Sequence, residues 1–237
     1  MISIFIATLL SIGSGLMDAD EQAQKQPSEA LRAFNGLIGE WKASGTPEGT
    51  REQRQKGFWT ESVAWAWQFK GSDAWLKVTF DKGKYFSNGE LRYLTEKDRY
   101  QLNLVTSTQA NLVFEGTAKD GRLILERTDE KSKETQRLTL TVLHEGSRFL
   151  YQLDTKPANR ASFSVVYKVG ATKQGIDFAS KGTVGPECVV SGGLGTMQVS
   201  YKGKTYYVCC TGCRDAFQDE PEKYIKEFNE RKAKERK

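Results

Sequence analysis

The chain has 237 residues, which is enough for one large domain or two smaller ones. Charged residues make up 27% of it and hydrophobic residues 38%, a balance that favours a soluble globular protein over a disordered or membrane-embedded one. The formal net charge of +5 comes largely from the basic tail, residues 231–237. Such a tail is typical of a solvated helix end, so we expect no nucleic-acid partner.

The N-terminus has the order of a secretory signal, because the apolar core Ile2–Leu10 is followed by small residues and then by polar ones. We therefore predict a signal peptide at residues 1–17, a polar linker at 18–29, and an exported protein that is periplasmic or secreted. The apolar run is shorter than the roughly 20 residues that a membrane span needs, so we expect no transmembrane span in the mature chain. The usual Lys or Arg near the start is missing, and the alternatives are an uncleaved segment that anchors the protein or a misassigned start.

One short helix is predicted where the folded part begins, because Ser28 is a suitable N-cap and Leu31, Phe34 and Leu37 recur at helical spacing before Gly39. Beyond it, apolar and polar residues alternate with a period of two in several short runs, which is typical of strands with one buried face. The apolar positions of these runs are Trp59, Val63, Trp65, Trp67, Phe69, Leu76, Val78, Phe80, Tyr100, Leu102, Leu104, Leu138, Leu140, Val142, Phe149, Tyr151, Leu153, Phe163, Val165, Tyr167 and Val169.

Turn sequences separate these runs, and we predict turns at residues 71–73, 88–89, 120–121 and 145–147. Many short strands joined by hairpins, with no helix between them, predict an antiparallel meander. A long meander normally closes into a barrel, because closure removes the exposed edges. We therefore expect a mainly β protein, with an antiparallel up-and-down β-barrel at residues 30–178 and a small α+β module after it.

The start of this region resembles the calycin-type barrels, the lipocalin-like carriers, in having a short helix, then Leu37-Ile38-Gly39-Glu40-Trp41, then a run of antiparallel strands. The resemblance implies an interior that could hold a small apolar ligand, and Trp59, Trp65 and Trp67 are the candidate ligand-binding residues. The alternative is a barrel filled by its own side chains, in which these tryptophans are core residues.

The single histidine, His144, falls in a predicted hairpin turn. A histidine in a turn is usually solvated, whereas haem ligation needs a pocket, so haem binding is not expected. One histidine also excludes most mechanisms that depend on an imidazole base or on His-rich zinc catalysis. The composition therefore favours a binding protein over an enzyme.

The cysteines lie close together near the C-terminus, after a small, polar segment that is typical of a linker. Cys188 is followed by 20 intervening residues and then by Cys209 and Cys210, and three residues separate Cys209 from Cys213. Two predicted strands meet at a tight turn over residues 202–204, so that one thiol comes from a loop, one from a strand end and one from the first turn of a helix. Three such sulfurs can converge on one point, and thiolates suit soft or borderline ions such as Cu(I) and Zn(II).

The segment 185–228 resembles the YHS domain, a member of the wider TRASH-like group of small metal-binding modules, and we expect this module to span residues 183–230. The matching features are Cys188 in ECVVSGG, the hairpin YKGKTYYVCC, Cys213, Ala216-Phe217 and Pro221-Glu222-Lys223-Tyr224. The resemblance implies that Cys188, Cys209 and Cys213 are metal ligands and that Cys210 is an additional thiol. Tyr206 and Phe217 are expected to support the site by packing.

Three functions remain open from the sequence. The first is binding, sensing or relaying a soft metal ion, with Cys210, Asp215 or water as a fourth ligand if the ion is Zn(II). The second is a carrier of a small apolar molecule in the barrel, with the cysteine module in a structural role. The third is a thiol–disulfide redox protein that uses Cys210 and Cys213, whose spacing is that of a redox pair. A structural disulfide without a metal is a further alternative for an exported protein.

Overall fold

The computed structural model describes residues 25–143, 146–175 and 185–236. The predicted signal peptide, most of the predicted linker and His144 lie outside these residues. None of the helices in the described part of the chain combines the length and the apolar character that a membrane crossing requires.

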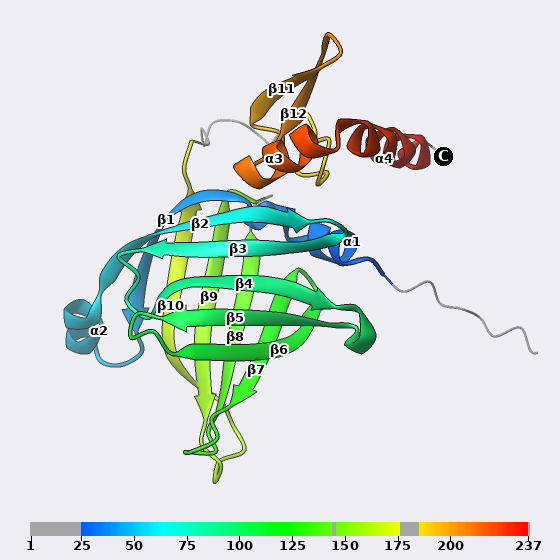
Figure 1. Ribbon diagram of the computed structural model, residues 1–237. Coiled ribbons are helices and arrows are strands. Elements are labelled where there is room, and N and C mark those ends of the chain that lie inside the picture. Colours follow the sequence, from blue (N-terminus) through cyan, green and yellow to red (C-terminus); the bar gives the residue numbers. More distant parts are fainter. Residues whose placement is uncertain (1–24, 144–145, 176–184, 237) are drawn as a thin grey trace, which may run out of the picture.

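Ten strands, then a two-stranded hairpin and two helices, make up most of the fold (Figure 1). In chain order, the elements are α1 (Pro27–Leu31), η1 (Arg32–Leu37), β1 (Gly39–Pro47), α2 (Arg51–Gly57), β2 (Trp59–Lys70), β3 (Asp73–Asp81), β4 (Phe86–Leu94), η2 (Thr95–Lys97), β5 (Arg99–Thr106), β6 (Asn111–Lys119), β7 (Arg122–Thr128), β8 (Thr135–Leu143), β9 (Arg148–Lys156), β10 (Ser164–Lys173), β11 (Met197–Tyr201), β12 (Lys204–Val208), α3 (Thr211–Asp219) and α4 (Pro221–Glu235).

The strands β1 to β10 form a closed antiparallel barrel in which each strand pairs with its neighbours in sequence. The barrel closes where β1 pairs with β10, in a register that places Trp41 opposite Lys173. Closure leaves no unpaired edge along these strands, which is the physical reason that a long meander curls up. The predicted fold class, a mainly β barrel followed by a hairpin and helices, is confirmed.

The barrel interior is filled by the apolar positions of the alternating strands. Trp41, Trp67, Phe114 and Phe149 are almost completely buried, and the rings of Trp41 and Phe149 meet edge to face with centroids 4.8 Å apart. Glu61 interrupts the apolar pattern of β2 but still points inward, because its carboxylate accepts hydrogen bonds from the hydroxyl of Tyr151 and the indole of Trp59. A buried carboxylate needs such donors, since burial without partners would be costly.

The helix α1 and the 3-10 helix η1 cover one end of the barrel. Tyr100 donates a hydrogen bond to the carbonyl of Ala30 at 3.1 Å, and the indole of Trp41 donates to the carbonyl of Leu37 at 2.7 Å. The helix begins at Pro27, which occupies the first turn, so Ser28 lies inside it and is not its N-cap as predicted. A proline suits this position because its missing N–H would have no partner in the first turn.

One predicted turn and the expected absence of helices from the meander are wrong. Residues 88–89 lie inside β4, where Gly89 pairs with Val78 and Leu104 on its two neighbours. A Cβ atom on Gly89 would lie 2.5 Å from the carbonyl oxygen of Asn103, so the glycine allows close approach of strands and does not turn the chain. The short helix α2 interrupts the meander between β1 and β2, and a capping box of Thr50 and Gln53 stabilises its start.

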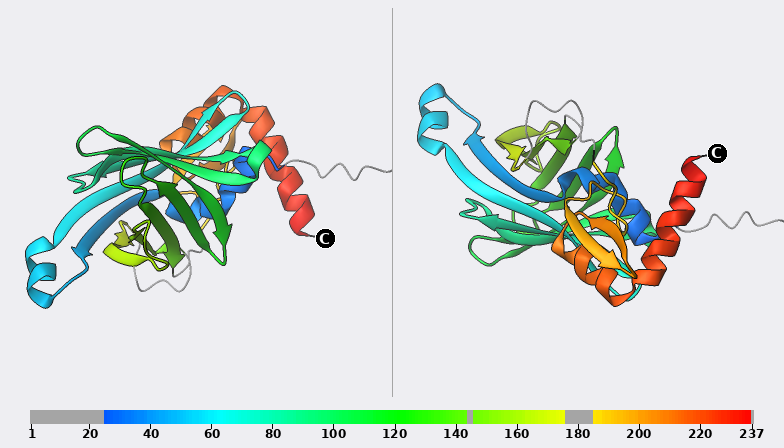
Figure 2. Two further views of the ribbon diagram at one scale, coloured as in Figure 1. Left: turned by 90° about the horizontal axis from the view of Figure 1, so that it is seen from below. Right: turned by 90° about the horizontal axis from the view of Figure 1, so that it is seen from above.

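The C-terminal module packs on the outside of the barrel beside β1 and β2 (Figures 1 and 2). Its hairpin β11–β12 and its helices α3 and α4 agree with the elements predicted there. The contact with β2 is very close, because a Cβ atom on Gly212 would lie 1.7 Å from the carbonyl oxygen of Trp67. The buried residues of the barrel and of the module form one continuous apolar core.

Candidate metal centre

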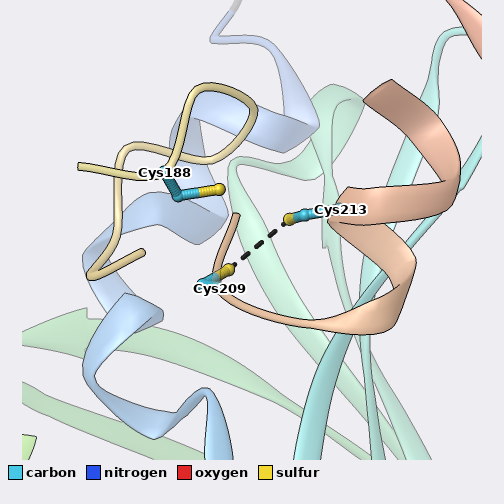
Figure 3. A group of neighbouring side chains, drawn as sticks. All are labelled: Cys188, Cys209 and Cys213. Carbon is cyan, nitrogen blue, oxygen red and sulfur yellow. Dashed lines mark hydrogen bonds between the residues drawn. The ribbon is translucent and has the colours of Figure 1, made fainter. Parts of the chain in front are cut away.

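Three cysteine thiols meet where the module faces the barrel. The sulfur atoms of Cys188, Cys209 and Cys213 all lie within 4.8 Å of one another, and those of Cys209 and Cys213 are 3.5 Å apart. Figure 3 shows Cys188 reaching from its loop toward the other two side chains. Cys209 directly follows β12 and Cys213 lies in the first turn of α3, so a loop, a strand end and a helix start each contribute one sulfur.

A tight loop holds Cys188 in place beside β12. The amide of Cys188 donates to the carbonyl of Gly193 at 2.6 Å, and the amide of Gly192 donates back to the carbonyl of Cys188 at 2.9 Å. The amide of Val189 donates to the carbonyl of Tyr207 at 2.8 Å, which ties the loop to the hairpin. Gly192 has a φ of +78°, a backbone conformation that favours glycine, so this turn depends on it.

Two side chains from outside the hairpin also anchor this loop. Asn35, on η1, donates to the carbonyl of Ser191 at 3.0 Å and accepts from the indole of Trp67 at 2.9 Å, so it links the barrel to the loop. Arg231, on α4, donates to the carbonyls of Cys188 at 3.4 Å and Val189 at 3.1 Å. The position of Cys188 therefore depends on the barrel and on the last helix as well as on the hairpin.

The pKa values of the four cysteine thiols are shifted in opposite directions. Hydrogen bonds from Cys209 and Cys213, together with the amide of Ser191, lower the pKa of Cys188. Hydrogen bonding to Cys188 raises the pKa of Cys209, and burial raises the pKa of Cys213. The hydrogen bond from Cys209 lowers the pKa of Cys210, with further stabilisation from the backbone amide of Trp67. At neutral pH the cluster is therefore a mixture of thiolates and thiols that donate to them.

This geometry fits a thiolate-bound metal ion. An ion with metal–sulfur bonds of about 2.3 Å holds its sulfurs about 3.8–4.0 Å apart in tetrahedral or trigonal geometry. The three sulfurs are already close to that separation. Cys188 and Cys213 have no exposed surface and Cys209 is 9% exposed, so water competes little for the ion.

The other candidate ligands are less well placed. The sulfur of Cys210 is 3.9 Å from that of Cys209, but Cys210 is not part of the cluster in which every pair lies within 4.8 Å. The side chain of Asp215 is 60% exposed and pairs with Arg214 at 2.9 Å. All four cysteines are free thiols, and their sulfur separations exceed the roughly 2.05 Å of a disulfide bond.

The same region matches a known family. Residues 195–227 match the YHS domain. The match confirms the resemblance for the hairpin, α3 and the first part of α4, and it includes Cys209, Cys210 and Cys213. The matched segment begins after Cys188. The loop contacts described above hold this thiol beside the other two. A comparison with curated proteins found no match.

The three tryptophans predicted to bind a ligand lie at separate positions along β2, and each contacts different residues. Trp67 bonds to Asn35, and Trp59 bonds to Glu61 under the ammonium of Lys84, which lies 4.6 Å from its ring. Trp65 lines a cavity inside the barrel with a volume of about 10 Å³, which is room for about one water molecule. A small apolar ligand would fit there only if several core side chains moved.

Sequence reasoning missed Asn35, Ser191 and Arg231. The side chain of Ser191 lies 3.3 Å from the sulfur of Cys209 and is buried. A small polar residue three positions after a proposed ligand is a signal that could have indicated it. Asn35 and Arg231 are 156 and 43 positions away from the carbonyls that they bind, and no local pattern predicts such contacts.

Proposed function

We propose that this protein binds a soft transition-metal ion through Cys188, Cys209 and Cys213, and that it handles or senses this ion without a catalytic role. The observation that carries the proposal is the convergence of three buried sulfurs within 4.8 Å of one another. The YHS match supports it, because the matched residues 195–227 contain two of the three cysteines, Cys209 and Cys213.

Cu(I) is the ion that the donor set favours. Cu(I) is a soft ion that prefers thiolate ligands and accepts two or three sulfurs, and three are present. Zn(II) is the alternative, and it would need a fourth ligand, since structural zinc sites are almost always tetrahedral. Cys210 or a water molecule would supply that ligand, at the side of the cluster nearest Cys209.

The test of this proposal is metal uptake by the full chain, purified without a tag under reducing conditions. We expect one Cu(I) or Zn(II) per chain by elemental analysis, with a thiolate-to-metal charge-transfer band for Cu(I). A protein that contains no metal and takes up neither ion from a weak chelator would contradict the proposal.

Metal affinity is expected to rise with pH. The pKa values of Cys209 and Cys213 are raised, so both are protonated at neutral pH, while that of Cys188 is lowered, so it is already a thiolate. Binding as three thiolates therefore releases two protons, and the apparent affinity should increase about 100-fold for each pH unit between pH 6 and pH 8. Competition titrations against a chelator of known pH dependence would measure this slope, and a slope near zero would show that both thiols are ionised before the metal binds.

A further inference from the structure

A cleft of about 670 Å³ lies between the barrel and the module, next to the thiols. The start of β1, the middle of β2 and the end of β10 form its barrel side, and residues at the start of β11 and directly after β12 form the other side. Its volume is in the range of about 300–1,000 Å³ that is usual for small-molecule sites, and such sites are frequent between domains. The cavity beside Trp65 inside the barrel, by comparison, has a volume of about 10 Å³.

The cleft reaches the thiols from one side. Cys209 and Cys210 line it, and they are 9% and 8% exposed, whereas Cys188 and Cys213 are completely buried behind them. An ion that enters through this cleft meets the sulfur of Cys209 first. Movement of about one metal–sulfur bond length then brings the ion into contact with the other two sulfurs.

The walls of the cleft combine apolar and charged groups. Met197 contributes an apolar side chain that narrows the cleft, and Lys173 contributes an amine that lies 3.3 Å from the carbonyl of Gly36 and 5.0 Å from the ring of Trp41. Burial lowers the pKa of Lys173 to about 8, which leaves it mostly protonated at neutral pH. Glu40 lies on the outer rim, where it is exposed. A partly buried ammonium on the wall of the cleft disfavours a bare hydrated cation and tolerates a metal whose charge a thiolate has already neutralised.

We infer that this cleft is the route by which the metal reaches its site, and that the metal arrives bound to a low-molecular-weight thiol. The inference rests on the proposed function. In the exchange, the sulfur of Cys209 forms a bond to the metal as the bond between the metal and the carrier sulfur breaks. The proton of the Cys209 thiol passes to the departing thiolate, which leaves as a free thiol, and the oxidation state of the metal does not change. The size of the cleft suits such a small molecule better than a folded protein domain.

The first test uses the metal-free protein. Ala64 lies on the outer face of β2, lines the cleft and pairs with Glu40 on β1, so Ala64→Trp would fill the opening. We expect iodoacetamide to modify Cys209 and Cys210 about tenfold more slowly in this variant, as measured by mass spectrometry. A change of this size lies within the range of about 10- to 1,000-fold over which association rate constants vary among variants of one site. The control is Val113→Trp, which adds the same ring to an exposed position on β6, across the barrel.

The second test follows loading from a Cu(I)–glutathione complex by stopped-flow absorption. Ala64→Trp should load about tenfold more slowly than Val113→Trp and bind the same final amount of Cu(I). Met197→Ala, which widens the cleft, should load faster than the unmodified chain, and it provides an independent result if Ala64→Trp does not fold. Alkylation and loading at unchanged rates in both cleft variants would overturn the inference. If the unmodified chain takes up neither Cu(I) nor Zn(II), the proposed function fails, and the alkylation rates still decide whether the cleft is the route to the thiols.

Discussion

The Cys209→Ser variant is expected to bind Cu(I) at least about 100-fold more weakly than the unmodified chain. Losing an outer partner of a metal ligand typically costs 10- to 100-fold in affinity, and the loss of a ligand itself should cost at least as much. Cys209 lies between the other sulfurs, 3.5 Å from that of Cys213 and 3.9 Å from that of Cys210. A serine oxygen there is a hard donor that a soft ion accepts poorly. Competition with a chromophoric chelator would measure the change.

The matched control is Cys210→Ser, which makes the same chemical change one residue further along the chain. A site with three ligands predicts that Cys210→Ser lowers the affinity by much less than Cys209→Ser does. Equal losses would indicate a site with four thiolates, and they would favour Zn(II) over Cu(I). If Cys209→Ser binds Cu(I) as tightly as the unmodified chain, the assignment of ligands is wrong. Circular dichroism would show that both variants retain the fold.

The Gly212→Ala variant is expected to destabilise the protein and to weaken the metal site together. The added methyl group would lie 1.7 Å from the carbonyl oxygen of Trp67, so α3 must move away from β2. Overpacking of this kind costs about 1–3 kcal/mol, and a backbone obstacle places this site at the upper end. For a domain of this size, about 3 kcal/mol lowers Tm by roughly 6–12 °C. Gly212 directly precedes Cys213, so the same movement displaces one of the sulfurs.

The control for this variant is Gly170→Ala, on β10. A Cβ atom there makes an ordinary contact of 3.5 Å with Leu150, so we expect little change in Tm and none in metal affinity. Thermal unfolding and chelator competition would be measured for both variants. A Gly212→Ala protein with unchanged Tm and affinity would show that the module does not need its close contact with β2 to form the site.

The three-cysteine cluster depends on parts of the chain that lie outside the YHS match. The YHS match covers residues 195–227, but Cys188, Asn35 and Arg231 all lie outside it. These residues place or anchor one of the three sulfurs. The barrel therefore forms part of the support for the candidate metal centre, and an isolated segment of residues 195–227 would lack both the Cys188 thiol and the barrel wall of the cleft.

Local patterns predicted most of the strands and the hairpin with its two helices. Alternation was informative because the inward positions of a closed barrel are mostly apolar. Glu61 is an exception in residue type only, since it also points inward, where it accepts a hydrogen bond from Tyr151. The error at residues 88–89 has a clear reason. An Asn-Gly pair suits a tight turn, but the same glycine also suits a strand that passes close to the backbone of its neighbour. The local sequence does not distinguish these two uses.

The sequence by itself determined that an antiparallel barrel precedes a cysteine-bearing hairpin and helices, because alternation and turn residues are local signals, and it identified the thiols as candidate metal ligands. The tertiary structure decided that Cys188 joins Cys209 and Cys213, that the cavity beside Trp65 in the barrel is small, and that a cleft is lined by Cys209 and Cys210. Each of these depends on contacts between residues far apart in the chain, such as Asn35 with Ser191 and Gly212 with Trp67. Short-range periodicity carries no information on contacts of this kind, because they form only when separately folded segments pack together.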